Sequence, residues 1–216
     1  MSTLQKGSKP LLRGHSHQAA FFVALGACLV LLNQTKSPRA FVSLIVYTLG
    51  LAGLFGISAL YHRPHWEAIP RSWMRRLDHA AIYLLIAGTV TPICLLGFRA
   101  DEGFVLLKTV WAAASIGILQ SLFWVKAPKW LNAILYVAVG WIAVPFFPEL
   151  LRVLGHSGVG LIAAGGVAYT LGAAVYALRR PDPWPRVFGY HEIFHALVVV
   201  GAFLHFLVVY RLLSLP

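Results

Sequence analysis

Residues 190–206 read YHEIFHALVVVGAFLHF, an apolar run long enough to begin crossing a bilayer. The run opens with His191, Glu192 and His195, and His205 follows further along it. Charged and strongly polar side chains are costly in hydrocarbon, so they usually face the interior of a helix bundle and have a partner there. This stretch therefore predicts a membrane-spanning helix that carries part of a buried polar site.

The composition of the whole chain is typical of a membrane protein. Of its 216 residues, 59% are hydrophobic and 12% are charged, whereas soluble domains are about half apolar and about one quarter charged. The net charge of +11 comes from cations in short stretches between apolar runs. This pattern suits anionic lipid headgroups and argues against a nucleic-acid partner. Cys28 and Cys94 both lie inside apolar segments and are interpreted as small core residues.

Seven apolar segments follow one another along the chain, each close to the ~20 residues needed to span ~30 Å of hydrocarbon. They cover residues 18–34, 41–61, 78–98, 103–124, 131–148, 157–178 and 191–213. Because the connections are short, consecutive helices should be antiparallel neighbours in one bundle. The sequence therefore predicts an all-α, polytopic membrane protein, with a basic cytoplasmic tail over residues 1–17 and a seven-transmembrane-helix bundle over residues 18–213.

The distribution of Lys and Arg predicts the orientation of this bundle. One side of the membrane receives twelve of these residues: Lys6, Lys9, Arg13, Arg63, Arg71, Arg75, Arg76, Lys126, Lys129, Arg179, Arg180 and Arg186. The other side receives five: Lys36, Arg39, Arg99, Arg152 and Arg211. Since cytoplasmic loops are enriched in cations, we expect the N-terminus inside, the C-terminus outside and the chain in the inner (plasma) membrane of the cell.

This topology brings polar residues that are distant in sequence to a similar depth near the cytoplasmic face. Ser58 and His62 close the second segment four residues apart, which places them on one helical face. His191 and His195 have the same spacing at the start of the seventh segment, and Asp78 opens the third. Three imidazoles from two helices with one open position describe a catalytic zinc site, so the histidines are candidate metal ligands.

Asp78 and Ser58 are the candidate catalytic residues of this site. Asp78 could hold or deprotonate a metal-bound water, because zinc lowers the pKa of water towards ~7. Ser58 lies one turn inward of His62 and could hydrogen-bond to Asp78, to the water or to a substrate oxygen.

Each of these residues also has a simpler interpretation. Histidines paired on a helix often pack against a neighbour, and Asp78 could form an ion pair with Arg75 or Arg76 or favour its helix N-terminus. Ser58 could be a packing residue, because a stripe of small residues that permits close helix approach precedes it. The stripe consists of Gly50, Gly53 and Gly56.

Other polar residues near the bundle are assigned to other environments. Glu192 is expected to face a headgroup, a basic loop or a partner of the histidine site. His79 is expected to point away from the surface that Asp78 presents. His205 lies roughly 15 Å beyond His195 along the helix and is expected to hydrogen-bond between helices near the outer half. Interfacial positions are predicted for His15, His17, His65 and His156.

At these residues the chain resembles the hemolysin III family and, through it, the progestin and adipoQ (adiponectin) receptor family. The matching pieces are SALYH at 58–62, LDHAAIYLLIAGTVTP at 77–92 and HEIFHALVVVGAFLH at 191–205. They fall in the second, third and seventh segments, and the seven-helix layout extends the resemblance over essentially the whole chain.

The resemblance implies a seven-helix bundle with its N-terminus inside and a zinc ion held by three histidines. These map to His62, His191 and His195, the aspartate that holds the zinc-bound water maps to Asp78, and the motif serine maps to Ser58. Related members of the superfamily include alkaline ceramidases, so the implied chemistry is hydrolysis of a lipid amide.

One departure from the family pattern precedes the first segment. The family's first-helix motif has an acidic residue, an Asn, then Ser or Thr followed by His. Here KPLLRGHSH has Lys9 and Arg13 in place of the acid and the Asn, and keeps only Ser16 and His17. The zinc site is predicted not to depend on this segment.

Three functions compete at this point. A zinc-dependent, ceramidase-like hydrolase of a lipid-like amide or ester comes first, with membrane lipids and a lipid-like small molecule as partners. A receptor or sensor of membrane state with structural zinc comes second. A pore-forming cytolysin comes third, because the polar residues are confined to one leaflet. The sequence leaves the substrate, turnover and the oligomeric state open.

Overall fold

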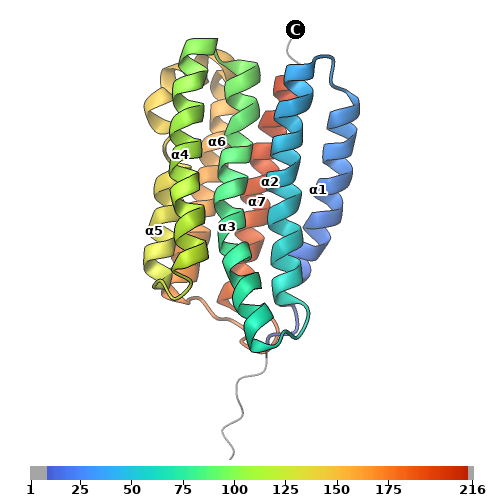
Figure 1. The fold of residues 1–216 in the computed structure, drawn as a ribbon, viewed down its shortest axis with the longest axis vertical. Coiled ribbons are helices and arrows are strands. Elements are labelled where there is room, and N and C mark those ends of the chain that lie inside the picture. Colours follow the sequence, from blue (N-terminus) through green and yellow to red (C-terminus); the bar gives the residue numbers. More distant parts are fainter. Residues whose placement is uncertain (1–8, 214–216) are drawn as a thin grey trace, which may run out of the picture.

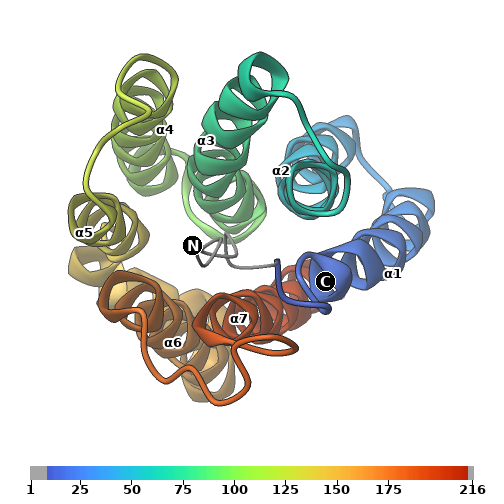
Figure 2. The ribbon, with the colours of Figure 1, turned by 90° about the horizontal axis from the view of Figure 1, so that it is seen from below.

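The computed structural model describes residues 9–213, which form a bundle of helices standing side by side (Figure 1). The helices are α1 (His15–Asn33), α2 (Pro38–His62), α3 (Ala68–Pro92), α4 (Ala100–Phe123), α5 (Lys129–Gly140), α6 (Phe147–Leu178) and α7 (Tyr190–Leu213). A π-helical turn, η1 (Ile93–Gly97), follows α3, and a 3-10 turn, η2 (Val144–Phe146), precedes α6. Viewed along the bundle, the helices follow one another around a ring, and α7 closes the ring against α1 (Figure 2).

Six stretches of the described chain are long and apolar enough to cross a membrane, judged by length and composition. They are His15–Asn33, Pro38–His62, Ala68–Gly97, Asp101–Phe123, Lys129–Leu178 and Tyr190–Leu213. The fifth stretch contains both α5 and α6, so it covers two of the seven apolar segments of the sequence. The all-α fold class predicted from the sequence is confirmed.

Two apolar clusters fill the bundle. One packs around Tyr47 between α1, α2, α3 and α7, and the other packs around Tyr83 where α3 meets α4 and α5. Cys28 belongs to the first cluster and Cys94 to the second; both are buried free thiols, as predicted. Large apolar side chains such as that of Phe203 remain exposed on the outer surface, where hydrocarbon can cover them.

Helix α3 begins at Ala68, ten residues before the apolar segment predicted at 78. The added turns are basic and carry Arg71 and Arg75, so hydropathy does not reveal them although they continue the helix. Positions 71, 75 and 78 are separated by four and three residues and therefore share one helical face. The extension thus places two cations on the same face as Asp78.

Helix α5 is shorter than the apolar segment predicted over 131–148. It ends at Gly140, and the chain then turns through η2, where Pro145 lacks the N–H group needed to continue it. Pro148 lies in the first turn of α6. Helix α6 contains a break at Gly155, whose φ of 64° is a conformation that glycine adopts at little cost.

Helices α2 and α3 approach each other closely through two glycines. A Cβ atom added to Gly50 would lie 2.9 Å from the carbonyl oxygen of Leu84, and one added to Gly88 would lie 3.1 Å from that of Val46. Side chains at either position would therefore push the two backbones apart. Since α2 ends in His62 and α3 carries Asp78, this contact holds together the two helices that carry those residues.

The close approach makes Gly50 sensitive to a small substitution. We expect Gly50→Ala to destabilise the bundle by about 1–3 kcal/mol, because the new methyl group meets a backbone oxygen that cannot rotate away. Gly53→Ala is the matched control: it lies in the same stripe, but a Cβ there would meet nothing within 4 Å. Thermal unfolding of the detergent-purified variants measures the difference, and equal melting temperatures would contradict the packing described.

Candidate metal centre

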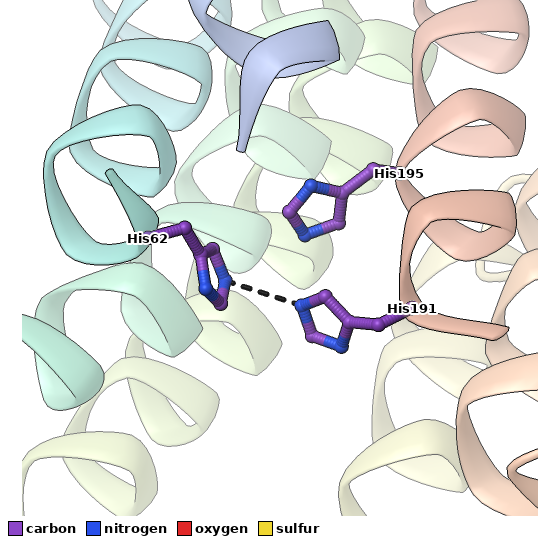
Figure 3. Close-up of side chains that lie close together, drawn as sticks. All are labelled: His62, His191 and His195. Carbon is purple, nitrogen blue, oxygen red and sulfur yellow. Dashed lines mark hydrogen bonds between the residues drawn. The ribbon is translucent and has the colours of Figure 1, made fainter. Parts of the chain in front are cut away.

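Three buried histidines meet at one end of the bundle (Figure 3). His62 is the last residue of α2, and His191 and His195 lie in the first turns of α7. One ring nitrogen from each lies within 4.8 Å of the others, and the Nε2 atoms of His62 and His191 are 3.2 Å apart. The helix ends thus bring together the three histidines that the sequence singles out, in an arrangement that could hold a metal ion.

The donor set fits a metal ion on two counts. Two imidazole nitrogens bound to one tetrahedral zinc at 2.0–2.1 Å would be about 3.3–3.4 Å apart, close to the separation of the His62 and His191 nitrogens. The rings of the three histidines also lie in mutual contact, with centroids 4.5 to 5.0 Å apart, so the three side chains converge on one place. Imidazole binds several divalent metals, so the geometry defines a metal site and not a particular metal.

Asp78 lies beside this cluster. Its Oδ2 atom is 3.7 Å from Nε2 of His62, and the Ser58 hydroxyl interacts with the same carboxyl group. In the described chain no arginine lies within 4.0 Å of that carboxylate, so the alternative ion pair with Arg75 or Arg76 is not formed. All five predicted site residues therefore gather at one end of the bundle, while their catalytic roles stay a prediction.

Glu192 anchors the start of α7 from inside the protein. Its carboxylate is buried, accepts a hydrogen bond of 2.8 Å from the backbone N–H of Gly189, and forms an ion pair with Arg13. Of the environments predicted for Glu192, the structure selects a basic segment, the one that precedes α1. These contacts hold the start of α7, whose first two turns carry His191 and His195.

The segment that precedes α1 closes over the same end of the bundle. The backbone N–H of Leu11 donates to the carbonyl of Arg186 in the α6–α7 connection, at 3.0 Å. Gly14, with a φ of 80°, sits so close to the end of α2 that a Cβ there would lie 2.8 Å from Cβ of His62. The segment that departs from the family pattern thus packs against the end of α2 that carries His62.

The sequence placed His17, which lies next to the candidate metal site, wrongly. It is buried, and its ring stacks on that of His195 with centroids 3.8 Å apart and planes within 6°. Its predicted interfacial position is therefore wrong. The predicted independence of the zinc site from this segment stays a prediction, which the His17→Ala variant tests. Hydropathy does not indicate that His17 is buried, because the apolar run begins only after it. Helical periodicity could have indicated its burial. The buried face of α1 consists of His17, Ala24, Cys28 and Leu31.

The other histidines occupy separate environments. His79 lines the same cavity as Asp78, but its Nδ1 atom hydrogen-bonds to the hydroxyl of Tyr136 on α5. The interhelical hydrogen bond predicted for His205 is confirmed, since its Nε2 atom lies 3.1 Å from the carbonyl oxygen of Ile162. Exposed or half-exposed positions, in line with the interfacial prediction, are found for His15, His65 and His156.

A polar cavity adjoins the site histidines, and a second, apolar cavity shares part of its lining. A polar cavity of about 680 Å³ is lined by His62, His191 and Asp78. An apolar cavity of about 120 Å³ lies deeper in the bundle. Ile82, Tyr136 and Phe194 line both, so the candidate metal site stands where a polar entrance meets an apolar interior.

Apolar helices that enclose a histidine cluster at one end define a multi-pass membrane protein with an internal candidate metal site. The chain belongs to the Haemolysin-III related family, whose sequence profile matches residues 5–206. It is 30% identical to Hemolysin-3 of Bacillus cereus over 194 residues, covering 88% of this chain and 85% of that protein. Its identity to the Hemolysin-3 homolog of Bacillus subtilis (strain 168) is 31% over 176 residues, covering 81% and 79%.

The wider resemblance is confirmed as well. The chain is 27% identical over 191 residues to the adiponectin receptor protein of Drosophila melanogaster, covering 80% of this chain and 42% of that protein. Family membership and apolar helices together support the predicted location in a membrane.

The stack of His17 on His195 leads to a prediction for metal affinity. Ligating histidines are normally oriented by a hydrogen bond to their second nitrogen. His195 lacks such a partner among the described residues, so we expect the stacked ring to take that role. His17→Ala should weaken metal binding about tenfold, within the range seen for residues that support metal ligands. His17→Phe, which keeps a flat ring, should retain most of the affinity.

Competition between the purified protein and a chromogenic chelator measures these affinities, with the exposed His156→Ala as the control. Wild-type affinity in His17→Ala would show that the stack does not orient the ligand.

Proposed function

We propose that this protein is a zinc-dependent hydrolase that cleaves lipid-like amides or esters within the membrane. The proposal is carried by the Asp78 carboxylate, which lies 3.7 Å from Nε2 of His62 and inside the cavity that His62 and His191 line. Structural zinc sites have four protein ligands, whereas three protein ligands leave a position for water or substrate. A carboxylate next to that position is placed for general acid–base catalysis.

When bound, a zinc ion would polarise the substrate carbonyl and make water nucleophilic at neutral pH. The residues of the chain move the proton. Asp78 accepts it from the attacking water and donates it to the leaving nitrogen or oxygen, so that one amide or ester bond yields a fatty acid and an amine or alcohol. The Ser58 hydroxyl, which interacts with Asp78, orients the carboxylate for both steps.

The adjoining cavities suit a substrate that is polar at one end and apolar at the other. The scissile bond would lie near Asp78 in the polar cavity, and the acyl chain would extend past Phe194 into the apolar cavity. Leu54, Leu85 and Val198 line that second cavity, and burying an acyl chain against them contributes ~0.8 kcal/mol per methylene group.

The location of the site follows from a proposed topology in which all of α1–α7 cross the membrane. Helix α5 alone has 12 residues, or about 18 Å, so the turns that follow it would complete its crossing. The N-terminus would lie in the cytoplasm, with the basic end of the bundle at the inner leaflet. A reporter that is active only outside the cytoplasm should work when fused after residue 213 and fail when fused after residue 180; the opposite pattern would exclude this orientation.

A receptor or sensor with a structural metal is the second candidate. His62 on α2 and His191 on α7 would share one ion beside Asp78 on α3, so metal binding would tie three helices together. The free energy of metal binding would then stabilise the fold directly. The site residues gather at one end of the bundle, and this arrangement gives no support to a pore.

Release of free fatty acid from acyl amides and esters, including short-chain ceramides, tests the hydrolase. We expect turnover by the zinc-loaded wild type, and a decrease of about 10²–10⁴-fold in Asp78→Asn because the proton acceptor is lost. His195→Ala should lose activity together with metal, while the exposed His156→Ala should keep both.

Equal turnover in Asp78→Asn and wild type would overturn the proposed mechanism. A protein that hydrolyses no substrate, but whose melting temperature falls sharply on chelation, would be the sensor instead.

A further inference from the structure

We propose that the entrance of the polar cavity binds an anionic headgroup, so that the substrates are negatively charged acyl amphiphiles such as N-acyl amino acids. Resting on the hydrolase function proposed above, this names the class of lipid that the site accepts. Neutral amphiphiles such as ceramides and N-acylethanolamines would bind more weakly.

Positive charge dominates the lining of this cavity. Its charged side chains comprise five cations and one carboxylate, that of Asp78. The cations are Lys9, Arg13, Arg71, Arg75 and Lys129. Arg13 is neutralised by Glu192. For the other four, no carboxylate lies within 4.0 Å in the described part of the chain, which includes all seven acidic residues.

The uncompensated charge is already costly to the protein. The pKa of the Lys9 ammonium group is lowered, first because the group is partly buried and then because Arg13, Arg63 and Arg71 repel it. Lys9 is held there by a hydrogen bond of 3.0 Å to the carbonyl oxygen of Arg63. A bound anion would relieve this repulsion, so the cluster favours a negatively charged ligand.

Arg71, Arg75 and Asp78 form a row along one face of α3 that leads from the entrance towards the histidines. The axial rise is about 6 Å from Arg71 to Arg75 and about 4.5 Å from Arg75 to Asp78. The half-buried Arg75 interacts electrostatically with both Asp78 and His79. A carboxylate two bonds from a scissile amide nitrogen near Asp78 would therefore be within reach of the Arg75 side chain, whose planar guanidinium can bind it through two hydrogen bonds.

Lys129 approaches the same entrance from α5. Its ammonium group donates to the hydroxyl of Tyr190 at 3.0 Å and lies 4.7 Å from the centre of the Tyr176 ring. These neutral partners hold the cation in place without cancelling its charge. Arg75 and Lys129 would thus approach the headgroup from two different helices.

The connection to the apolar interior identifies the ligand as an amphiphile rather than a free anion. Ile82, Tyr136 and Phe194 line both cavities, so a ligand held by its anionic end at the entrance can pass an apolar chain between them. A small soluble anion would use the cations and leave the apolar cavity unfilled.

Binding of N-oleoylglycine and N-oleoylethanolamine tests the proposal, because the two share an acyl chain and an amide and differ mainly in a carboxylate against a hydroxyl. Affinities are measured by calorimetry on the full chain in nonionic detergent, in wild type and in Asp78→Asn. We expect N-oleoylglycine to bind about tenfold more tightly or better, as one charge-assisted pair would give, and the preference to shrink in high salt. Arg75→Gln and Arg71→Gln should each reduce this preference, to about threefold or less for Arg75→Gln, whose side chain lies nearer Asp78.

Lys126→Gln is the control, since Lys126 is an exposed cation at the same end of the bundle but outside the cavity lining. N-acetylglycine, with the headgroup but no chain, should not displace N-oleoylglycine at equal concentration. Equal affinity for the two oleoyl compounds, or an unchanged preference in both arginine variants, would overturn the proposal. If N-acetylglycine displaced N-oleoylglycine at equal concentration, the inference that the ligand is an amphiphile would be wrong. Because binding to Asp78→Asn is read without turnover, each outcome is separate from a failure of hydrolysis.

Discussion

Three imidazoles packed together in an apolar bundle are the constraint on which the rest of the structure depends. Burying such groups is costly unless their nitrogens are satisfied, and the Nε2 atoms of His62 and His191 face each other at 3.2 Å. A shared cation resolves this cost for His62, His191 and His195 together. It would also require the end of α2 and the start of α7 to remain close together, which the packing of Gly14 against His62 and the Arg13–Glu192 ion pair both support.

The site lies next to both a polar and an apolar environment. On one side, cations from α3, α5 and the segment before α1 surround a polar cavity; on the other, apolar side chains line the interior. The Asp78 carboxylate lies in the polar cavity, within 3.7 Å of a histidine nitrogen. A lipid whose scissile bond separates a charged head from an acyl chain fits a polar cavity that adjoins an apolar one. The hydrolytic reaction and the substrate class are therefore proposed for the same site.

Much of this arrangement could be predicted from the sequence, because hydropathy and helical periodicity are local properties. Apolar runs gave the all-α membrane fold, and four-residue spacings with alternating topology brought His62, His191, His195, Asp78 and Ser58 to one end. The features that the sequence did not predict are polar helix turns and contacts between segments distant in the chain. The basic first turns of α3 were invisible to hydropathy, and Pro145 shortened α5. His17 lies just before an apolar run, and its contact with His195 depends on the ring closing between α1 and α7. The Arg13–Glu192 pair joins residues from opposite ends of the chain, which no local pattern reveals.

The central claim is that imidazoles from α2 and α7 hold one metal ion between them. Inductively coupled plasma mass spectrometry on the detergent-purified protein, in wild type and in His62→Ala, measures this directly. The account predicts about one zinc ion per chain in wild type and its loss in His62→Ala, since two nitrogens of one helix do not make a closed site. Wild-type protein that holds no metal after exposure to zinc, or a His62→Ala variant that holds as much as wild type, would contradict it.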